Sequence, residues 1–289
     1  MSFRTLMVPF LNVQSAQGTF ALAASAARVF GAHIEATHLR QHPPIPANVY
    51  QPFPYAYVPV DVAEIEEAAQ KAADELKAAF EQLCAAHDVS VGPAPNPSPA
   101  AAASASWLEV KGDFPKGYAQ AARCCDLSVM TRFSEDTPRF EIDVLEELLF
   151  NSGRPVLIGD GAFQSLTNTV LIAWDGGREA ARAVTAATPA LMAAARVIVA
   201  TVGPVSASLA TAERLAERLR RCGVAAEAHE VTVEPGEKPE ARLISYAHNL
   251  ATELIVMGAY SHSRLRELVL GGFTKRLLSE PSIPLLLAH

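Results

Sequence analysis

The chain alternates between two kinds of segment. Short, almost uninterrupted apolar runs are separated by longer stretches in which apolar residues recur every three or four positions. The short runs are typical of parallel strands covered on both faces, and the periodic stretches are typical of helices that lie on a sheet. The predicted helices cover residues 15–30, 61–87, 177–192, 207–222 and 239–252. This alternation predicts right-handed crossovers and a twisted parallel sheet.

The pattern of strands and helices occurs twice. The matching apolar runs are residues 3–10 and 169–175, residues 126–132 and 253–259, and residues 152–158 and 282–287. A chain of 289 residues is long enough for two domains that each bury a core. We therefore predict an α/β protein with two domains, residues 1–160 and 167–289, each a five-stranded parallel sheet flanked by helices.

Two interruptions lengthen the first copy. Residues 41–59 combine prolines with aromatic residues such as Tyr50 and Phe53. Rings on an extended backbone make good contact surface for a protein partner, and the same rings could instead pack across the mouth of the first domain. Residues 92–106 are rich in Pro, Ala and Ser, and we predict a surface connection there.

Composition and charge exclude several classes of function. With a net charge of −7 and no basic run, the chain has no concentrated basic face for the phosphates of nucleic acid. No apolar segment is long enough to span a bilayer, and residues 1–9 lack the pattern of a secretory leader. We therefore expect no nucleic-acid partner, no membrane association and a cytoplasmic location.

The cysteines point to the same compartment. Cys84, Cys124, Cys125 and Cys222 form no Cys-x-x-Cys pair, and we predict reduced, partly buried thiols. Cys84 and His87, three apart on a predicted helix, could hold a metal, but no partner pair stands at ligand spacing. We therefore predict no metal site.

Chemistry is expected where parallel strands end, because ligands of open α/β sheets lie outside the carboxyl ends of the strands. In the second copy, the candidate binding residues are Asp175, Val202, Met257, Gly258, Ser261, His262, Arg264, Gly271, Gly272 and Thr274. Gly271 and Gly272 precede a helix-forming segment, and backbone N–H groups at a helix start favour an anion. Arg264 adds positive charge beside this point, although it could equally be a solvated loop residue.

Asp175 follows the opening strand of the second copy. A carboxylate there could accept hydrogen bonds from a ribose or an adenine amino group, or it could cap the helix that begins near Arg178. The two roles are compatible. The first copy has Leu11 in place of this acid, and its fourth strand leads into a glycine-free, carboxylate-rich loop, residues 131–143. We predict that the first copy neither cradles nor attracts a phosphate.

The spacing after the fourth strand carries a family resemblance. Gly258, two residues, Ser261, nine residues, Gly271 and Gly272 resemble the motif of the universal stress protein family, which is Gly, two residues, Gly, nine residues, Gly, then Ser or Thr. Ser261 replaces the second Gly of that motif, and Gly272 replaces its final Ser or Thr.

The resemblance implies a tandem member of this family, with Rossmann-like domains of the adenine nucleotide alpha hydrolase-like type. It further implies a cytoplasmic stress-response protein that binds ATP, with Mg²⁺ accompanying it, or a related adenine nucleotide in the second copy. Family members pair domains through the last strand, so residues 155–158 and 284–287 are expected to join edge to edge as an intrachain pseudo-dimer. The sequence does not decide whether two whole chains also form a homodimer.

The sequence holds no Gly-x-Ser-x-Gly elbow, P-loop or His-Glu-x-x-His motif, so we predict no catalytic residues and at most slow ATP hydrolysis. Two alternatives remain. One is a ligand-independent scaffold of the same fold that binds an unidentified protein. The other is a nucleotide-dependent hydrolase or transferase of the wider adenine-nucleotide-binding group.

Overall fold

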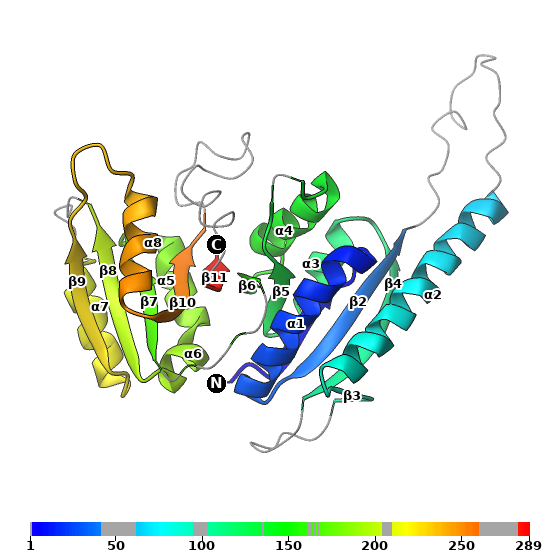
Figure 1. Cartoon of the computed structure of the whole chain (residues 1–289), viewed down its shortest axis with the longest axis horizontal. Coiled ribbons are helices and arrows are strands. Elements are labelled where there is room, and N and C mark those ends of the chain that lie inside the picture. Colours follow the sequence, from blue (N-terminus) through cyan, green and yellow to red (C-terminus); the bar gives the residue numbers. More distant parts are fainter. Residues whose placement is uncertain are drawn as a thin grey trace, which may run out of the picture.

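Strands and helices alternate through both halves of the chain, as the apolar pattern predicts. The computed structural model describes residues 2–41, 62–94, 103–134, 136–160, 163, 166, 168–203, 210–259 and 283–289. The first half contains β1 (Thr5–Pro9), α1 (Val13–Phe30), β2 (His33–Gln41), α2 (Val62–Ala86), β3 (Ser90–Val91), β4 (Ser104–Gly112), α3 (Lys116–Ala122), β5 (Leu127–Thr131), α4 (Arg139–Asn151) and β6 (Val156–Gly159) (Figure 1).

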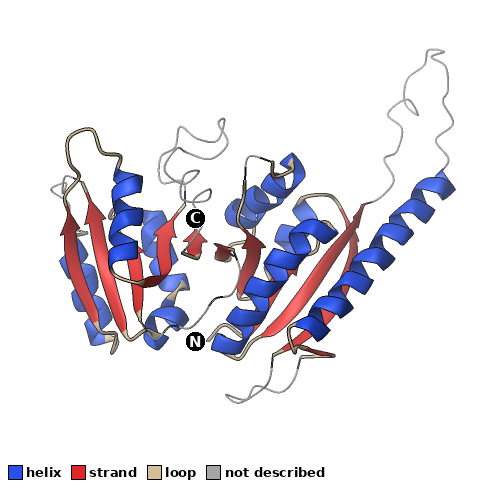
Figure 2. Ribbon diagram, viewed as in Figure 1, coloured by secondary structure: helices blue, strands red, loops and turns tan. Residues whose placement is uncertain are grey.

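The second half repeats this order with fewer elements. It contains β7 (Thr169–Ala173), α5 (Arg178–Ala186), α6 (Thr188–Ala193), β8 (Arg196–Val202), α7 (Ala212–Arg221), β9 (Ala226–Val231), α8 (Pro239–Asn249), β10 (Thr252–Gly258) and β11 (Leu285–Ala288). Within the described residues the strands form one eleven-stranded sheet in the order β3-β4-β2-β1-β5-β6-β11-β10-β7-β8-β9 (Figure 2). In each half the opening strand is central, and later strands are added on both sides of it.

The two halves join through their last strands, as predicted. β6 and β11 pair antiparallel, with Leu157 opposite Leu286, whereas the other strand pairs of the sheet are parallel. This pairing satisfies two strand edges that would otherwise be open to association. Arg132 reinforces the joint, because its Nη2 donates to the carbonyl oxygen of Ile283 at 2.7 Å.

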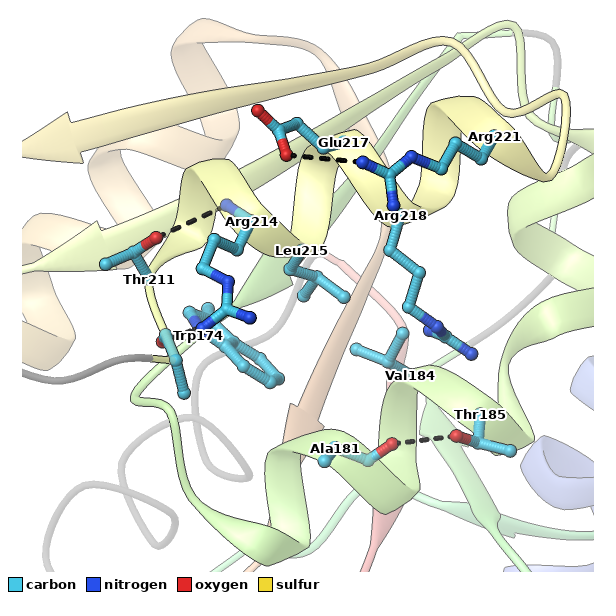
Figure 3. A pocket seen from close by; sticks show the side chains of 11 residues that line it. Trp174, Ala181, Val184, Thr185, Thr211, Arg214, Leu215, Glu217, Arg218 and Arg221 are labelled. Atoms are coloured by element: carbon cyan, nitrogen blue, oxygen red, sulfur yellow. Dashed lines mark hydrogen bonds and ion pairs between the residues drawn. The ribbon is translucent and has the colours of Figure 1, made fainter.

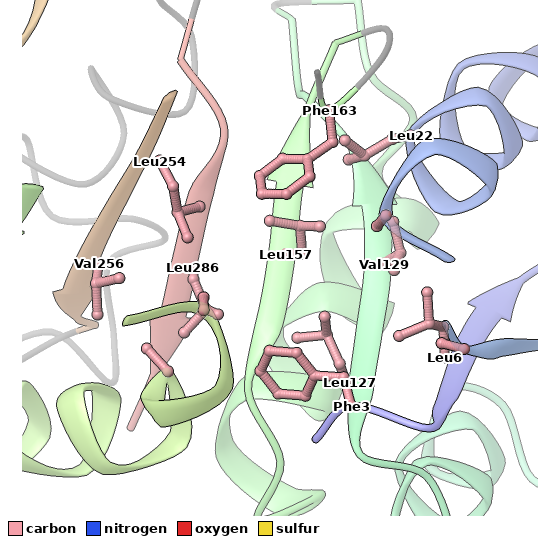
Figure 4. Close-up of a cluster of buried hydrophobic side chains, with 14 of the residues drawn as sticks. Phe3, Leu6, Leu22, Leu127, Val129, Leu157, Phe163, Leu254, Val256 and Leu286 are labelled. Atoms are coloured by element: carbon pink, nitrogen blue, oxygen red, sulfur yellow. The ribbon is translucent and has the colours of Figure 1, made fainter. Parts of the chain in front are cut away.

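Apolar side chains cover both faces of the sheet. On one face, residues of α1, α2, α5 and α7 pack in a cluster that continues across the joint through Leu157 and Leu286 (Figure 4). On the other face, residues of α3, α4 and α8 form a second cluster. The short apolar runs of the sequence are therefore buried on both sides, which is the environment that their composition predicts.

The structure corrects three expectations of the sequence. The predicted helix 177–192 is two helices, α5 and α6, because Pro189 stands at the start of α6, where a missing N–H costs nothing. The predicted connection 92–106 is shorter, since Ser104 to Ser106 already belong to β4. The first half also has a sixth, two-residue strand, β3, at the edge of the sheet.

All four cysteines are free thiols; Cys84 and Cys125 are buried, and Cys124 and Cys222 are exposed. Burial raises the pKa of the Cys84 and Cys125 thiols to about 12 each. Among the described residues, no cluster of three or more His, Cys, Asp or Glu side chains is arranged to hold a metal ion. In the same part of the chain, none of the helices has the length and apolarity needed to cross a membrane.

Candidate functional site

Asp175 stands at the point where the strand order of the second half reverses. β7 pairs with β8 on one side and with β10 on the other. Trp174, the residue after β7, is fixed by its backbone N–H, which donates to the carbonyl oxygen of Ala200, and by its Nε1, which donates to that of Ala210, both at 2.8 Å. The carboxylate of Asp175 is therefore exposed at the carboxyl edge of the sheet, where ligands of such folds bind.

The Asp175 side chain makes a local turn. Its Oδ1 accepts the backbone N–H of Gly177 at 2.7 Å. Gly177 is the N-cap residue of α5, and no side chain caps this helix. Asp175 thus organises the turn before the helix and does not cap the helix directly. Among the described residues, no hydrogen bond to Oδ2 is seen.

Gly258 ends β10 directly under the first turn of α5. A Cβ at this position would lie 2.4 Å from the backbone nitrogen of Ala180 and 2.6 Å from the carbonyl carbon of Glu179. Glycine is therefore required because helix and strand are in direct backbone contact. The sequence marked Gly258 as a candidate binding residue, and the structure adds this packing role.

A cavity of about 430 Å³ lies beside Asp175, at the carboxyl ends of β7, β8 and β9. We call it the Asp175 cavity. It is lined by Trp174, Asp175, Thr201, Ala210, Thr211, Ala212, Glu213, Ala228, His229 and Glu230. Of these residues, only Asp175 was expected from the sequence. The others could have been found by taking every residue near the ends of the second and third strands, because these ends share one edge.

The charges that line the Asp175 cavity are carboxylates, whereas those of the neighbouring groove are three arginines and Glu217. Asp175, Glu213 and Glu230 line the cavity itself, and Glu213 forms an ion pair with Arg220 at 2.6 Å. A larger groove of about 650 Å³ lies next to it, between α5 and α7, with Trp174 as a shared wall. Arg214, Arg218 and Arg221 line this groove (Figure 3). The cavity is thus acidic, and the positive side chains lie along α7.

The other predicted site residues are divided between two places. Val202, at the end of β8, is half-buried, and Met257 is buried in the core on the α8 side. Neither lines the Asp175 cavity. Ser261, His262, Arg264, Gly271, Gly272 and Thr274 lie outside the described residues.

Comparison with known proteins identifies this half of the chain. Residues 167–289 match the model of the universal stress protein family. The second half is a universal stress protein domain. Universal stress protein Slr1230 of Synechocystis is 32% identical over 149 residues, which cover 49% of this chain and 49% of that protein. The match thus spans about half of that relative's length.

The fold of the whole chain is also shared with a solved structure. A universal stress protein from Archaeoglobus fulgidus matches 98% of this chain with 95% of its own length, at a TM-score of 0.65 and 15% identity. At this identity the likeness concerns the fold alone. Within this chain, both halves arrange strands in the same way around the opening strand, β2-β1-β5 in the first half and β8-β7-β10 in the second.

Proposed function

We propose that the universal stress protein domain binds an adenine nucleotide, ATP or a close relative, beside Asp175, and acts in the cytoplasmic stress response. One observation carries the proposal: an exposed carboxylate stands at the strand-order reversal, next to a cavity large enough for a base and a ribose. Oδ2 of Asp175 would accept a hydrogen bond from a ribose hydroxyl or from the adenine amino group. The hydroxyls of Thr201 and Thr211 line the same cavity and supply further polar partners.

The phosphates would be held elsewhere. Asp175, Glu213 and Glu230 repel a triphosphate, so it would extend away from the cavity, past the end of β10. Residues 260–274 follow that strand, and their spacing of Ser261, Gly271, Gly272 and Thr274 supports a phosphate cradle there. Mg²⁺ would accompany the phosphates, neutralise part of their charge and keep most of its water ligands. No side chain is proposed as a catalytic base, so hydrolysis would be slow at most.

The experiment compares two Asp→Asn variants by isothermal titration calorimetry with ATP. Asp175→Asn keeps the Oδ1 acceptor for Gly177 N–H, so the turn is retained while the ligand loses a charged partner. We expect affinity to fall about tenfold, or about 1.4 kcal/mol. Asp136→Asn is the matched control, since it is exposed, lies in the first half and changes net charge equally. Equal affinities for both variants and the wild type would place the nucleotide away from Asp175.

A scaffold without a ligand is the second candidate function. It is favoured by the contact between Gly258 and α5, because backbone of the helix already occupies the space beside this glycine. The acidic lining of the Asp175 cavity points the same way. Mass spectrometry of freshly purified, denatured protein separates the two candidates. Co-purified adenine nucleotide supports the binding proposal, whereas an empty protein with no calorimetric response to ATP supports the scaffold.

A further inference from the structure

The first half has a cavity of its own at the carboxyl edge of the sheet. It measures about 320 Å³ and is lined by Leu11, His38, Leu39, Phe114, Tyr118 and Phe140. We call it the Tyr118 cavity. Its walls come from the ends of β1 and β2, from the β4–α3 connection and from the first turns of α3 and α4. None of the lining residues carries a fixed charge.

This position corresponds to the strand ends proposed to bind nucleotide in the second half. The backbone N–H of Phe10 donates to the carbonyl oxygen of Thr37 at 2.8 Å, as that of Trp174 does to Ala200. These two bonds make Phe10 equivalent to Trp174, and Thr37 equivalent to Ala200. Leu11 in the first half therefore corresponds to Asp175 in the second, and Leu39 corresponds to Val202. The acid that we propose as a partner of ribose or adenine is therefore an aliphatic side chain in the first half.

In the first half, a carboxylate of the protein itself already lies at the start of α4. Glu141 lies in the first turn of α4 and is only 4% exposed. Its Oε1 accepts a hydrogen bond of 2.6 Å from Nδ2 of Asn12, the N-cap residue of α1. A carboxylate already interacts favourably with the positive end of α4, so a phosphate there would meet like charge.

Two polar groups remain beside the aromatic walls. The Tyr118 hydroxyl accepts the backbone N–H of Leu39 at 3.2 Å, and its own proton has no acceptor among the described residues. Burial raises the pKa of Tyr118 to about 12, so the hydroxyl stays protonated. Nδ1 of His38 lies 3.1 Å from the carbonyl oxygen of Phe10 and must donate to it, so the tautomer with its proton on Nδ1 presents Nε2 as an acceptor. The residues of the cavity therefore offer one donor and one acceptor.

We propose that the Tyr118 cavity binds a small, uncharged aromatic compound with a hydroxyl group, and that it excludes the phosphorylated form of the same ring. Phe114, Phe140 and Tyr118 supply edges and faces for an aromatic ring, and the volume suits a one- or two-ring compound. The ligand hydroxyl can accept from Tyr118 and donate to His38. The two halves would then have sites of different chemistry at corresponding strand ends.

The test titrates the full chain with 1-naphthol and with 1-naphthyl phosphate, which differ only in the phosphate. We expect one saturable site for 1-naphthol and binding of 1-naphthyl phosphate at least about tenfold weaker. Equal or tighter binding of the phosphate at the same site would overturn the proposal. An absence of saturable 1-naphthol binding would also overturn it.

Two phenylalanines of α4 locate the site. Phe140 lines the cavity and is 37% exposed, whereas Phe150 is 38% exposed, lies on the same helix and does not line it. Phe140→Ala should weaken 1-naphthol binding about tenfold, and Phe150→Ala should leave it unchanged. Tyr118→Phe keeps the ring and removes only the hydroxyl, so it should weaken 1-naphthol by about fivefold.

Each outcome of these variants is decisive once melting curves show that they are folded. Loss of affinity in Phe140→Ala and Tyr118→Phe, with Phe150→Ala unaffected, supports the proposal. Unchanged affinity in either Phe140→Ala or Tyr118→Phe would refute it, because the proposal requires 1-naphthol to contact both side chains. The result does not depend on ATP, so the nucleotide proposal for the second half can fail or succeed independently.

Discussion

Replacing Gly258 with alanine tests how β10 and α5 are held together. The new Cβ would lie 2.4 Å from the nitrogen of Ala180, whereas ordinary contact begins near 3.4 Å. The other two nearest atoms are the carbonyl carbon and the Cβ of Glu179, at 2.6 and 2.9 Å. None of the three moves when a side chain changes rotamer, so α5 must move by roughly 1 Å. Overpacking against backbone costs about 3 kcal/mol, and the lower entropy of the unfolded alanine chain offsets up to about 1 kcal/mol of that. We expect a net loss of about 2 kcal/mol.

Thermal unfolding measures this loss and shows how the chain unfolds. With an unfolding entropy of about 2.1 cal/mol/K per residue, 2 kcal/mol lowers the melting temperature by about 3 °C if all residues unfold together. The shift rises to about 8 °C if the second half unfolds alone. Gly92→Ala is the control, because a Cβ there meets nothing within 4 Å and the backbone suits alanine. A Gly258→Ala protein as stable as this control would refute the close contact between strand and helix.

Two further predictions concern stability. Burial lowers the pKa of His33 from 6.5, so the neutral ring is held in the folded protein between the hydroxyls of Ser104 and Ser106. The unfolded chain then takes up a proton first as pH falls, and urea denaturation should show stability decreasing below about pH 6.5, by at most about 1.4 kcal/mol per pH unit. In His33→Gln this part of the pH dependence should disappear. Arg132→Met should lose about 2 kcal/mol in urea denaturation, because the carbonyl oxygen of Ile283 loses its donor, and an unchanged unfolding free energy would show that this bond does not stabilise the joint.

The central strands were predictable because burial on both faces requires a continuous apolar run. β5, β7 and β10 are of this kind. The start of β4 was assigned to the connection 92–106 because it reads Ser104-Ala105-Ser106, a composition typical of a linker. Those small residues pair in register with β2, and the two serine hydroxyls satisfy the ring nitrogens of His33. A pattern of local composition cannot reveal a partner that lies 70 residues earlier in the chain.

The candidate site was predictable only in part, for a geometric reason. Asp175 could be found because it follows a strand in sequence. Thr211 and His229 reach the same cavity from a helix start and from the edge strand β9, and only the strand order brings them together. Met257 was expected beside the ligand, but alternation along β10 turns its side chain toward α8. The role of Gly258 also required the structure, since the contact with α5 spans about 80 residues of sequence.

The joint between the halves explains how the two edges could become different. β6 and β11 use only the outer strand of each half, so the pairing covers neither cavity. Phe10 and Trp174, which correspond, are both buried and preserve the core at the end of the opening strand. At the next position the two halves differ, because the first has Leu11 and the second has Asp175. These two residues lie beyond the last buried position of the opening strand. A charged residue can therefore be replaced by an apolar one there, while the stability of the sheet still depends on the buried residues that precede it.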